Sequence, residues 1–306
     1  MTGYLHDPEC FARHNSDGHP ENAGRLALIR AADNIQPAAW RPATDEELLA
    51  VHTPGLIKRV KAVCENGGGM LDADTYCGAQ SETVARNAAG GLIDLSLGVL
   101  DDSYSNGLAL IRPPGHHATS DQSMGFCLFN NVAVAAAALR RQGAAKVAII
   151  DFDVHHGNGT QDIFYEDNTV LYLSSHQYPH YPGSGSAFEK GKGPGLGYTL
   201  NHPLQAGSAD EEFLAAYSEN LLPALAKFNP DFILVSAGYD AHLEDPLAGL
   251  NVTTEGFVAV IRLIVQAADD LCQGKVVFSL EGGYNPEVLA ECLYETLDVL
   301  TAFKGR

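Results

Sequence analysis

The sequence predicts an α/β protein built on one doubly wound parallel β-sheet that is flanked by helices. Short, nearly continuous apolar runs alternate with longer amphipathic segments, and polar side chains gather where each apolar run ends. Such runs are typical of strands that are buried on both faces. The alternation of strand and helix implies βαβ units within a single sheet. The predicted strands are Gly107–Arg112, Lys146–Asp153, Val170–Ser175, Asp231–Ala237 and Lys275–Glu281.

Amphipathic segments of helical length lie before, between and after these strands. Ser81 and Ser208 stand just ahead of acidic residues, so both are predicted to cap the N-termini of helices. The chain up to about residue 80 is rich in loop-forming residues, and we expect it to wrap one end of the sheet. The predicted helices are Glu21–Asp33, Ser81–Leu100, Asn130–Arg141, Ala209–Phe228, Thr253–Cys272 and Pro286–Phe303.

The composition is that of a globular protein. The chain has 306 residues, of which 45% are apolar and 19% are charged. A chain of this length buries a large core, and no repeat or linker interrupts it, so we expect one domain over residues 1–306. The longest strongly apolar stretch, Val132–Leu139, is too short to cross a membrane. The first residues lack the features of a secretory signal, and we expect no contact with a membrane.

The net charge and the cysteine content indicate which partners and which cellular compartment to expect. The net charge of −19 would repel phosphate, which argues against nucleic acid as a partner. The same charge would attract a basic peptide or a polyamine. None of the six cysteines is spaced as CxxC, and this pattern predicts buried thiols in a reducing cytoplasm.

Reactive side chains follow each predicted strand at its carboxyl end. In open parallel α/β sheets, ligands bind just beyond this edge, so five strands deliver His, Asp and Tyr to one crevice. The clusters are Arg-Pro-Pro-Gly-His-His ending at His117, Asp-Phe-Asp-Val-His-His-Gly-Asn-Gly beginning at Asp151, Ser-Ser-His ending at His176, Ser-Ala-Gly-Tyr-Asp-Ala-His ending at His242, and Glu-Gly-Gly-Tyr-Asn beginning at Glu281.

Three of these side chains form a candidate metal site. Asp153 and His155 are two residues apart on an extended segment, so their side chains point the same way. Asp240, at the end of a neighbouring strand, is the natural third protein ligand. Three protein ligands leave a coordination position for water or substrate, as in catalytic zinc sites. Without a thiolate, the same donors also suit iron or manganese.

A histidine pair stands beside this site. His116 and His117 follow Pro-Pro-Gly, a rigid turn that would hold both rings in place. We expect Asp151 to bond His116 and Asn158 to bond His117. A neutral amide stabilises an imidazolium less than a carboxylate does, so His117 should lose its proton more readily and act as the general base.

Aromatic residues complete the predicted pocket. Tyr284 follows two glycines and is a candidate hydrogen-bond donor to the oxyanion of a tetrahedral intermediate. Gly125, Phe126 and Tyr181 flank the histidine and metal segments, where the two rings would form a narrow slot for an aliphatic chain.

These strings, in this order, closely resemble the zinc-dependent histone deacetylase family, which includes bacterial deacetylase-like amidohydrolases and acetylpolyamine amidohydrolases. The resemblance runs from His19 to Tyr284. It implies an arginase-like α/β fold and a single deacetylase-like catalytic domain. It also implies one zinc ion per chain, and the family often carries a structural potassium ion, which would lie near Asp151, His155 and Ser174.

The resemblance assigns a role to each residue. Asp153, His155 and Asp240 fall at the zinc-ligand positions, and His116, His117 and Tyr284 fall at the tandem-histidine and oxyanion positions. Phe126 and Tyr181 fall at the tunnel walls, Leu247 at the apolar rim and Asp74 at the rim acid that holds the substrate backbone. The second wall residue is Tyr where Phe is more usual, and Asn158 is typical of the class II branch.

The implied reaction is hydrolysis of an acetylated lysine side chain in a peptide or protein. Three further functions are compatible with the same fold. An acetylpolyamine amidohydrolase would share the chemistry, although the apolar Leu247 favours acyl-lysine. A two-manganese ureohydrolase would need further bridging aspartates. A catalytically inactive binding protein would lack a metal or oxyanion residue, and none is missing. The sequence carries no prediction of the oligomeric state.

Overall fold

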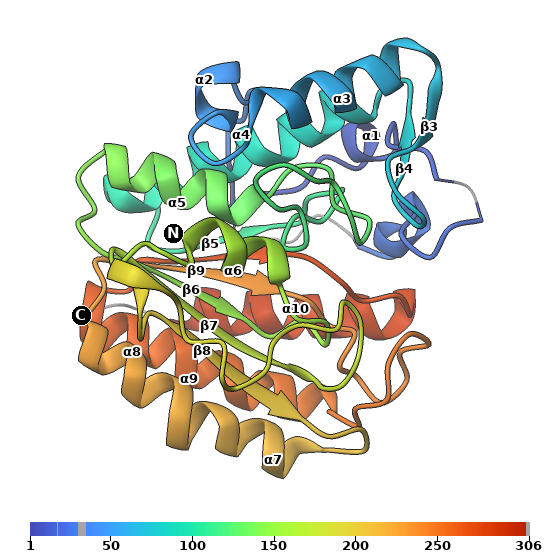
Figure 1. Cartoon of the computed structure of the whole chain (residues 1–306). Helices are drawn as coiled ribbons and strands as arrows, with labels where there is room; N and C mark the ends of the chain where they lie inside the picture. The colour runs from blue at the N-terminus through green and yellow to red at the C-terminus, as the bar shows by residue number, and fades with distance from the viewer. Residues whose placement is uncertain (17, 30–34, 304–306) are drawn as a thin grey trace.

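A computed structural model describes residues 1–16, 18–29 and 35–303 (Figure 1). Within these residues the main sheet has eight strands in the order β2-β1-β5-β10-β9-β6-β7-β8, and each of its pairings is parallel. This confirms the predicted fold class. The strands are β1 Gly3–Leu5, β2 Gln36–Pro37, β5 Gly107–Ala109, β6 Val147–Asp151, β7 Val170–Gln177, β8 Thr199–Leu204, β9 Phe232–Ala237 and β10 Val276–Leu280.

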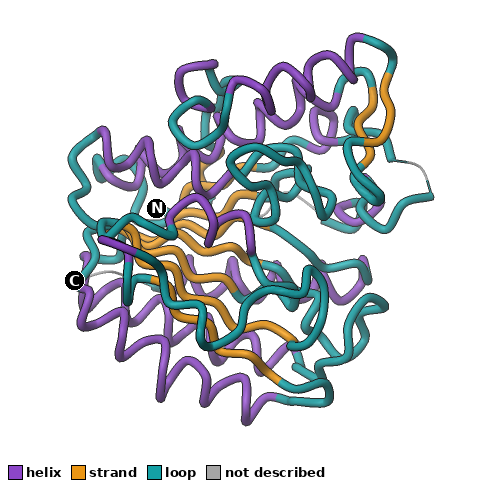
Figure 2. The backbone as a smooth tube through the Cα atoms, in the orientation of Figure 1, coloured by secondary structure: helices purple, strands orange, loops and turns teal. Residues whose placement is uncertain are grey.

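Alternate side chains of the central strands enter two separate cores. In β6, Ala148 and Ile150 pack on one face, and Val147 and Ile149 pack on the other. Because both faces are apolar, helices must cover both, and Figure 2 shows this layering. One face carries α7 Asp210–Ala215, α8 Leu222–Phe228, α9 Thr254–Cys272 and α10 Pro286–Ala302; the other carries α4 Ser81–Leu100 and α5 Asn131–Arg141.

A further layer packs on the outer surface of α4 and α5 (Figure 1). It contains α2 Asp45–Leu48, α3 Pro54–Glu65 and a hairpin of β3 Gly68–Met70 and β4 Tyr76–Gly78. Its apolar side chains, including Leu56 and Val60, form a third core. The two short helices α1 Pro8–Phe11 and α6 Asn158–Phe164 complete the described elements on this side of the sheet.

The N-terminal part is more ordered than the sequence predicts. Instead of only wrapping the sheet, it supplies the edge strand β2, the neighbouring strand β1 and the twelve-residue helix α3. The strands β1 and β2 are too short to show a periodic pattern. The strand at the opposite edge, β8, was not predicted either. Polar residues interrupt its apolar ones, and it contains Pro203, which sheets tolerate at an edge.

The predicted helix Glu21–Asp33 is wrong where the structure describes it. Only a 3₁₀ turn, η1 Ala23–Leu26, forms there, and residues 30–33 lie outside the described residues. Asn22 caps this turn by accepting a bond from the Gly24 amide. The pattern of apolar residues suggests a helix with Arg25 on its solvated face. In the structure Arg25 is fully buried and forms an ion pair with Glu21.

The predicted helix Ala209–Phe228 is continuous but contains a π-helical segment, η3 Ala216–Leu221. Pro223 follows this segment and has no amide hydrogen for the preceding turn, which favours such a local widening. Neither predicted serine cap forms. Ser81 is the first residue of its helix, and its hydroxyl bonds the His14 ring, while Ala209 is the cap residue of α7.

All six cysteines are buried and unpaired. No helix among the described residues is both long and apolar enough to cross a bilayer.

Candidate metal centre and catalytic pocket

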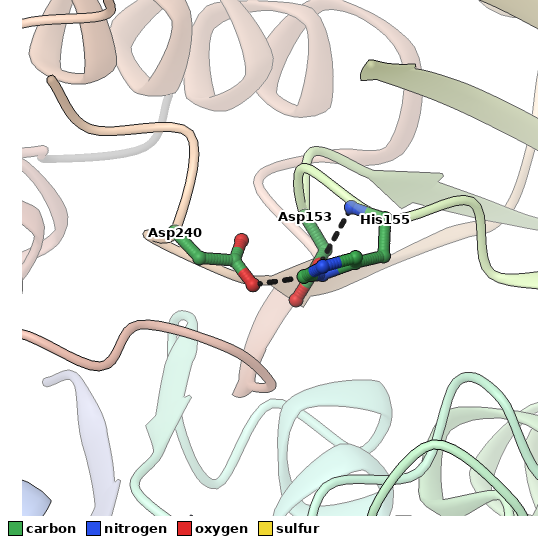
Figure 3. Close-up of side chains that lie close together, drawn as sticks. All are labelled: Asp153, His155 and Asp240. Atoms are coloured by element: carbon green, nitrogen blue, oxygen red, sulfur yellow. Dashed lines mark hydrogen bonds and ion pairs between the residues drawn. The ribbon is translucent and has the colours of Figure 1, made fainter. Parts of the chain in front are cut away.

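Three predicted ligands meet at the carboxyl ends of two neighbouring strands (Figure 3). Asp153 and His155 follow β6, and Asp240 follows β9, which pairs with β6. The Nδ1 atom of His155 lies 3.1 Å from Asp153 Oδ1 and 3.1 Å from Asp240 Oδ2. One ligand atom from each residue lies within 4.8 Å of the others. The three donors therefore surround a space suited to one cation.

Backbone amides and glycines hold the two carboxylates in this arrangement. Gly282 donates its N–H to Asp153 Oδ2 at 2.8 Å, and Val154 donates to Asp240 Oδ1 at 2.9 Å. A Cβ atom at Gly282 would overlap both carboxylates, so only glycine permits this approach. The Glu-Gly-Gly turn after β10 thus packs against the candidate metal site.

The charges of the three groups fit a cation. Burial, together with the charge of Asp153, raises the pKa of Asp240 to about 7. Burial alone would lower the pKa of His155, but its bonds to Asp153 and Asp240 raise it to about 10. Two buried carboxylates therefore require a positive partner, either a proton on His155 or a bound ion. An oxygen, nitrogen, oxygen donor set with three protein ligands matches catalytic zinc and also suits iron or manganese.

His116 is bonded to a carboxylate. Its Nδ1 lies 3.1 Å from Asp151 Oδ2, and the same oxygen accepts the hydroxyl of Tyr172 at 3.1 Å. Burial opposes the charged form of His116, but Asp153 and Asp151 outweigh it and raise its pKa to about 10. The two carboxylates therefore favour the protonated form of the His116 ring.

His117 is bonded to a neutral amide. Its Nδ1 lies 2.8 Å from Asn158 Oδ1, and the amide nitrogen of Asn158 donates to Met124 Sδ at 3.4 Å. The sulfur contact fixes the amide orientation, so Nδ1–H donates to Asn158 and Nε2 keeps a free lone pair. Burial, followed by repulsion from His116 and His155, holds the pKa of His117 well below its ordinary value. This ring is neutral and able to accept a proton.

A narrow pocket of about 80 Å³ opens onto these groups. All five predicted substrate contacts line it. The rings of Phe126 and Tyr284 have centroids 5.9 Å apart, and those of His117 and Tyr181 are 5.1 Å apart, both edge to face. A Cβ atom at Gly125 would collide with the His117 ring. The lining residues are Asp74, His117, Gly125, Phe126, His155, Tyr181, Leu247 and Tyr284.

Tyr284 is held from two sides. Its N–H donates to Asp245 Oδ2 at 2.7 Å, and the Arg25 guanidinium lies 4.8 Å from its ring centroid. Arg25 also donates to the carbonyls of Gly283 at 2.7 Å and Glu281 at 2.6 Å. Burial raises the pKa of Tyr284 well above its ordinary value, against the opposing charge of Arg25, so the phenol keeps its proton.

Sequence reasoning missed three supporting residues. The buried Glu281 carboxylate accepts the N–H of Gly115 at 2.6 Å and of His116 at 3.2 Å, which aligns the histidine pair. The sequence does place Glu281, a charged residue, at the end of an apolar strand, and this position could have indicated its role. Arg25 could be found only as the i,i+4 partner of Glu21. His180 stacks on His155 with centroids 5.2 Å apart, and no local pattern reveals that contact.

Arg112 ties the N-terminal segment to this site through a buried ion pair, and its replacement by methionine is expected to destabilise the fold. Arg112 Nε and one Nη lie 2.5 and 2.8 Å from the two oxygens of Glu21, which Arg25 also contacts. Arg112→Met would leave Glu21 underpaired inside the protein, at a cost of about 3–5 kcal/mol. Urea unfolding measures the loss. A change below about 1 kcal/mol would contradict it, and Arg141→Met, at an exposed pair, is the control.

Comparisons with known proteins agree with this site and fold. Residues 19–300 match the histone deacetylase domain model. A probable deacetylase of Archaeoglobus fulgidus is 38% identical over 100% of this chain and 87% of its own. A histone deacetylase-like amidohydrolase of Pseudomonas aeruginosa is 40% identical, over 100% of this chain and 81% of its own. The crystal structure of the HDA15 HD domain matches with a TM-score of 0.93 and 37% identity, over 99% of this chain and 91% of that one. The chain therefore belongs to the histone deacetylase family and has its arginase-like fold.

Proposed function

We propose that this chain, acting as one catalytic domain over residues 1–306, is a zinc-dependent amidohydrolase that removes acetyl groups from lysine side chains in peptides or proteins. One observation carries the proposal. A single narrow pocket brings the proton acceptor His117, the phenol of Tyr284 and the metal-site residue His155 together beneath aromatic walls. An extended acyl-lysine side chain fits such a slot, with its amide at the base.

The ion would be held by Asp153, His155 and Asp240. When bound, zinc polarises a carbonyl oxygen and makes water easier to deprotonate. The surrounding chain supplies the remaining chemistry. Gly282 and Val154 orient the two carboxylates through their amides.

His117 is the proposed general base. Its Nε2 accepts a proton from the attacking water, and Asn158 keeps Nδ1 in the protonated tautomer throughout. The same nitrogen then returns the proton to the lysine amine as the amide bond breaks. A neutral partner on Nδ1 suits this shuttle, because the ring must both gain and lose the proton at one pH.

Tyr284 is the proposed oxyanion donor, and removal of its hydroxyl is expected to slow turnover. Tyr284→Phe should lower kcat about 10²–10³-fold, the cost of losing one donor to a developing oxyanion. Binding of a hydroxamate should persist, because the metal ligands and pocket walls are intact. Steady-state kinetics and calorimetry measure both. Normal turnover would remove the oxyanion role, and Tyr198→Phe, at a half-buried ring outside the pocket, is the matched control.

The pocket walls define the proposed substrate class. Phe126 and Tyr181 would pack on the aliphatic part of the side chain, with Gly125 leaving room between them. Leu247 gives the rim an apolar contact. Asp74 offers a carboxylate at the rim that would accept N–H groups of the substrate backbone.

An acetylpolyamine is the second candidate, because the net charge of −19 and Asp74 at the rim would attract a free cation. The structure weighs against it at one point, since Asp245 is committed to the amides of Leu247 and Tyr284. We therefore expect kcat/KM for an acetyl-lysine peptide to exceed that for acetylspermidine. The opposite order would assign the chain to polyamines, and no turnover of either would refute the proposed hydrolysis.

A two-manganese ureohydrolase has less support. The metal-ligating cluster found among the described residues has one set of three ligands, whereas a ureohydrolase would need further aspartates for a second ion. We also propose the cytoplasm as the compartment, in keeping with six unpaired cysteines.

A further inference from the structure

Two buried cysteines lie in contact beside the pocket rim. Cys64 comes from the last turn of α3, and Cys77 comes from the centre of β4. Their Sγ atoms are 3.0 Å apart. A disulfide needs about 2.05 Å, so a shift of about 1 Å would join them. The two thiols belong to elements that are separate in the fold, and a bond between them would link α3 to the β3–β4 hairpin.

The surroundings of Cys64 favour its thiolate. The N–H of Glu82, in the first turn of the twenty-residue helix α4, donates to Cys64 Sγ at 3.3 Å. A helix N-terminus stabilises negative charge, and this effect activates cysteines. The Glu82 carboxylate, whose charge opposes the thiolate, is paired with Arg86 Nε at 2.5 Å. Cys64 therefore has a hydrogen-bond donor on one side and a second thiol on the other.

The remaining cysteines lack such an arrangement. The contact with Cys77 and the Glu82 amide lower the pKa of Cys64 to about 7, although burial opposes this. Burial instead raises the pKa of Cys272 and of Cys292 to about 12, and that of Cys127 well above its ordinary value. Cys64 is 6% exposed, whereas Cys77 is fully buried, so Cys64 is the more accessible of the two thiols.

We propose that Cys64 and Cys77 form a dithiol that a peroxide oxidises to an intramolecular disulfide. The Cys64 thiolate attacks one peroxide oxygen, the O–O bond breaks, and hydroxide leaves, giving a sulfenic acid. The Cys77 thiol then attacks the Cys64 sulfur, the S–O bond breaks, and water leaves. Two electrons pass from the two sulfurs to one hydrogen peroxide, and a dithiol reductant reverses the reaction. This inference is independent of the proposed hydrolysis.

The bond would constrain the loop that forms the pocket rim. It would close residues 65–76, which contain β3 and the turn that carries Asp74. That turn already contacts the pocket, because Thr75 Oγ1 accepts the N–H of Phe126 at 3.1 Å and the Asp74 carbonyl bonds the His19 ring at 3.0 Å. Oxidation would therefore restrict the motion of the β3–β4 hairpin and of Asp74 at the pocket rim.

The test begins with the folded full-length protein, hydrogen peroxide and mass spectrometry. Trypsin leaves residues 62–86 as one peptide that holds both Cys64 and Cys77 and no other cysteine. After peroxide and denaturing alkylation, this peptide should lose both alkylation sites and two hydrogen atoms, and dithiothreitol should restore them. Cleavage at the acidic residues between the cysteines should leave two fragments joined until reduction.

Cysteine variants test whether Cys64 is the residue that reacts first with peroxide. In Cys77→Ser, dimedone should trap a sulfenic acid on Cys64, and the rate of its formation should exceed that at Cys272 by about tenfold or more. Cys272→Ser is the matched control, and its 62–86 peptide should oxidise as in the wild type. In the oxidised wild type, amide hydrogen exchange over residues 66–76 should be slower than in the reduced protein and unchanged in Cys77→Ser.

Three results would overturn the inference. The first is that both thiols stay alkylatable at peroxide concentrations that oxidise the other cysteines. The second is that Cys64 pairs with a different cysteine. The third, which removes the link to the rim, is that exchange over residues 66–76 does not change when the disulfide forms.

Discussion

Alanine at position 117 is expected to lower kcat on an acetyl-lysine peptide by about 10²–10⁴-fold, the contribution of a well-placed general base. His117 is the neutral member of the histidine pair, and its Nδ1 is bonded to Asn158 at 2.8 Å, so the opposite nitrogen faces the pocket as an acceptor. Its removal leaves water without a base and the departing amine without a proton donor.

The control for this variant separates catalysis from folding and metal binding. His117 is not one of the three grouped metal-site residues, so the zinc content of His117→Ala should equal that of the wild type. His202→Ala removes a partly buried ring on the edge strand β8 and should leave turnover unchanged. A rate like that of the wild type in His117→Ala would show that another group serves as the base.

The substitution Asp240→Asn is expected to abolish both metal binding and turnover. Asp240 is 1% exposed, and its Oδ2 lies 3.1 Å from His155 Nδ1, so the change removes a ligand charge at the centre of the site. Loss of a partner that only supports a ligand costs about 10–100-fold in metal affinity, so loss of a ligand should cost more. Elemental analysis of purified protein and steady-state kinetics measure the two effects.

The matched control is Asp298→Asn, which neutralises an exposed acid on α10 far from the pocket lining. It should keep full metal content and turnover. If Asp240→Asn retained one zinc per chain and normal activity, the ligand assignment would be wrong. Because Val154 donates its N–H to Asp240 Oδ1, the asparagine must keep its carbonyl oxygen toward that amide, and circular dichroism checks the fold.

The central strands and the site could be predicted because one physical rule governs both. Buried parallel strands such as β6 and β9 read as apolar runs, and their carboxyl ends meet at one edge. The position of Asp153 just beyond β6 and of Asp240 just beyond β9 then brings the two carboxylates together. Asp151 was expected to bond His116 because it precedes the candidate metal ligands on the same strand, and this bond forms, as does the expected bond between Asn158 and His117.

Contacts between distant segments could not be predicted in the same way. From the sequence, Arg25 looks like a polar residue on the surface of a helix. In the structure it is buried against the turn that carries Tyr284, and it donates to the carbonyl of Gly283, which lies 258 residues further along the chain. The Cys64–Cys77 pair reads as ordinary core packing, because neither spacing nor periodicity shows that α3 ends against β4. The strands β1 and β2 were missed because two or three residues are too few for a pattern.

Metal reconstitution is the sharpest test of a single catalytic zinc ion held by Asp153, His155 and Asp240. Protein stripped by a chelator should be inactive toward an acetyl-lysine peptide, and activity should rise in proportion to added zinc and saturate at one ion per chain. Asp153→Asn, handled in parallel, should stay inactive. Saturation at two ions, full activity in the stripped protein, or no hydrolysis at any loading would refute hydrolysis that depends on one zinc ion per chain.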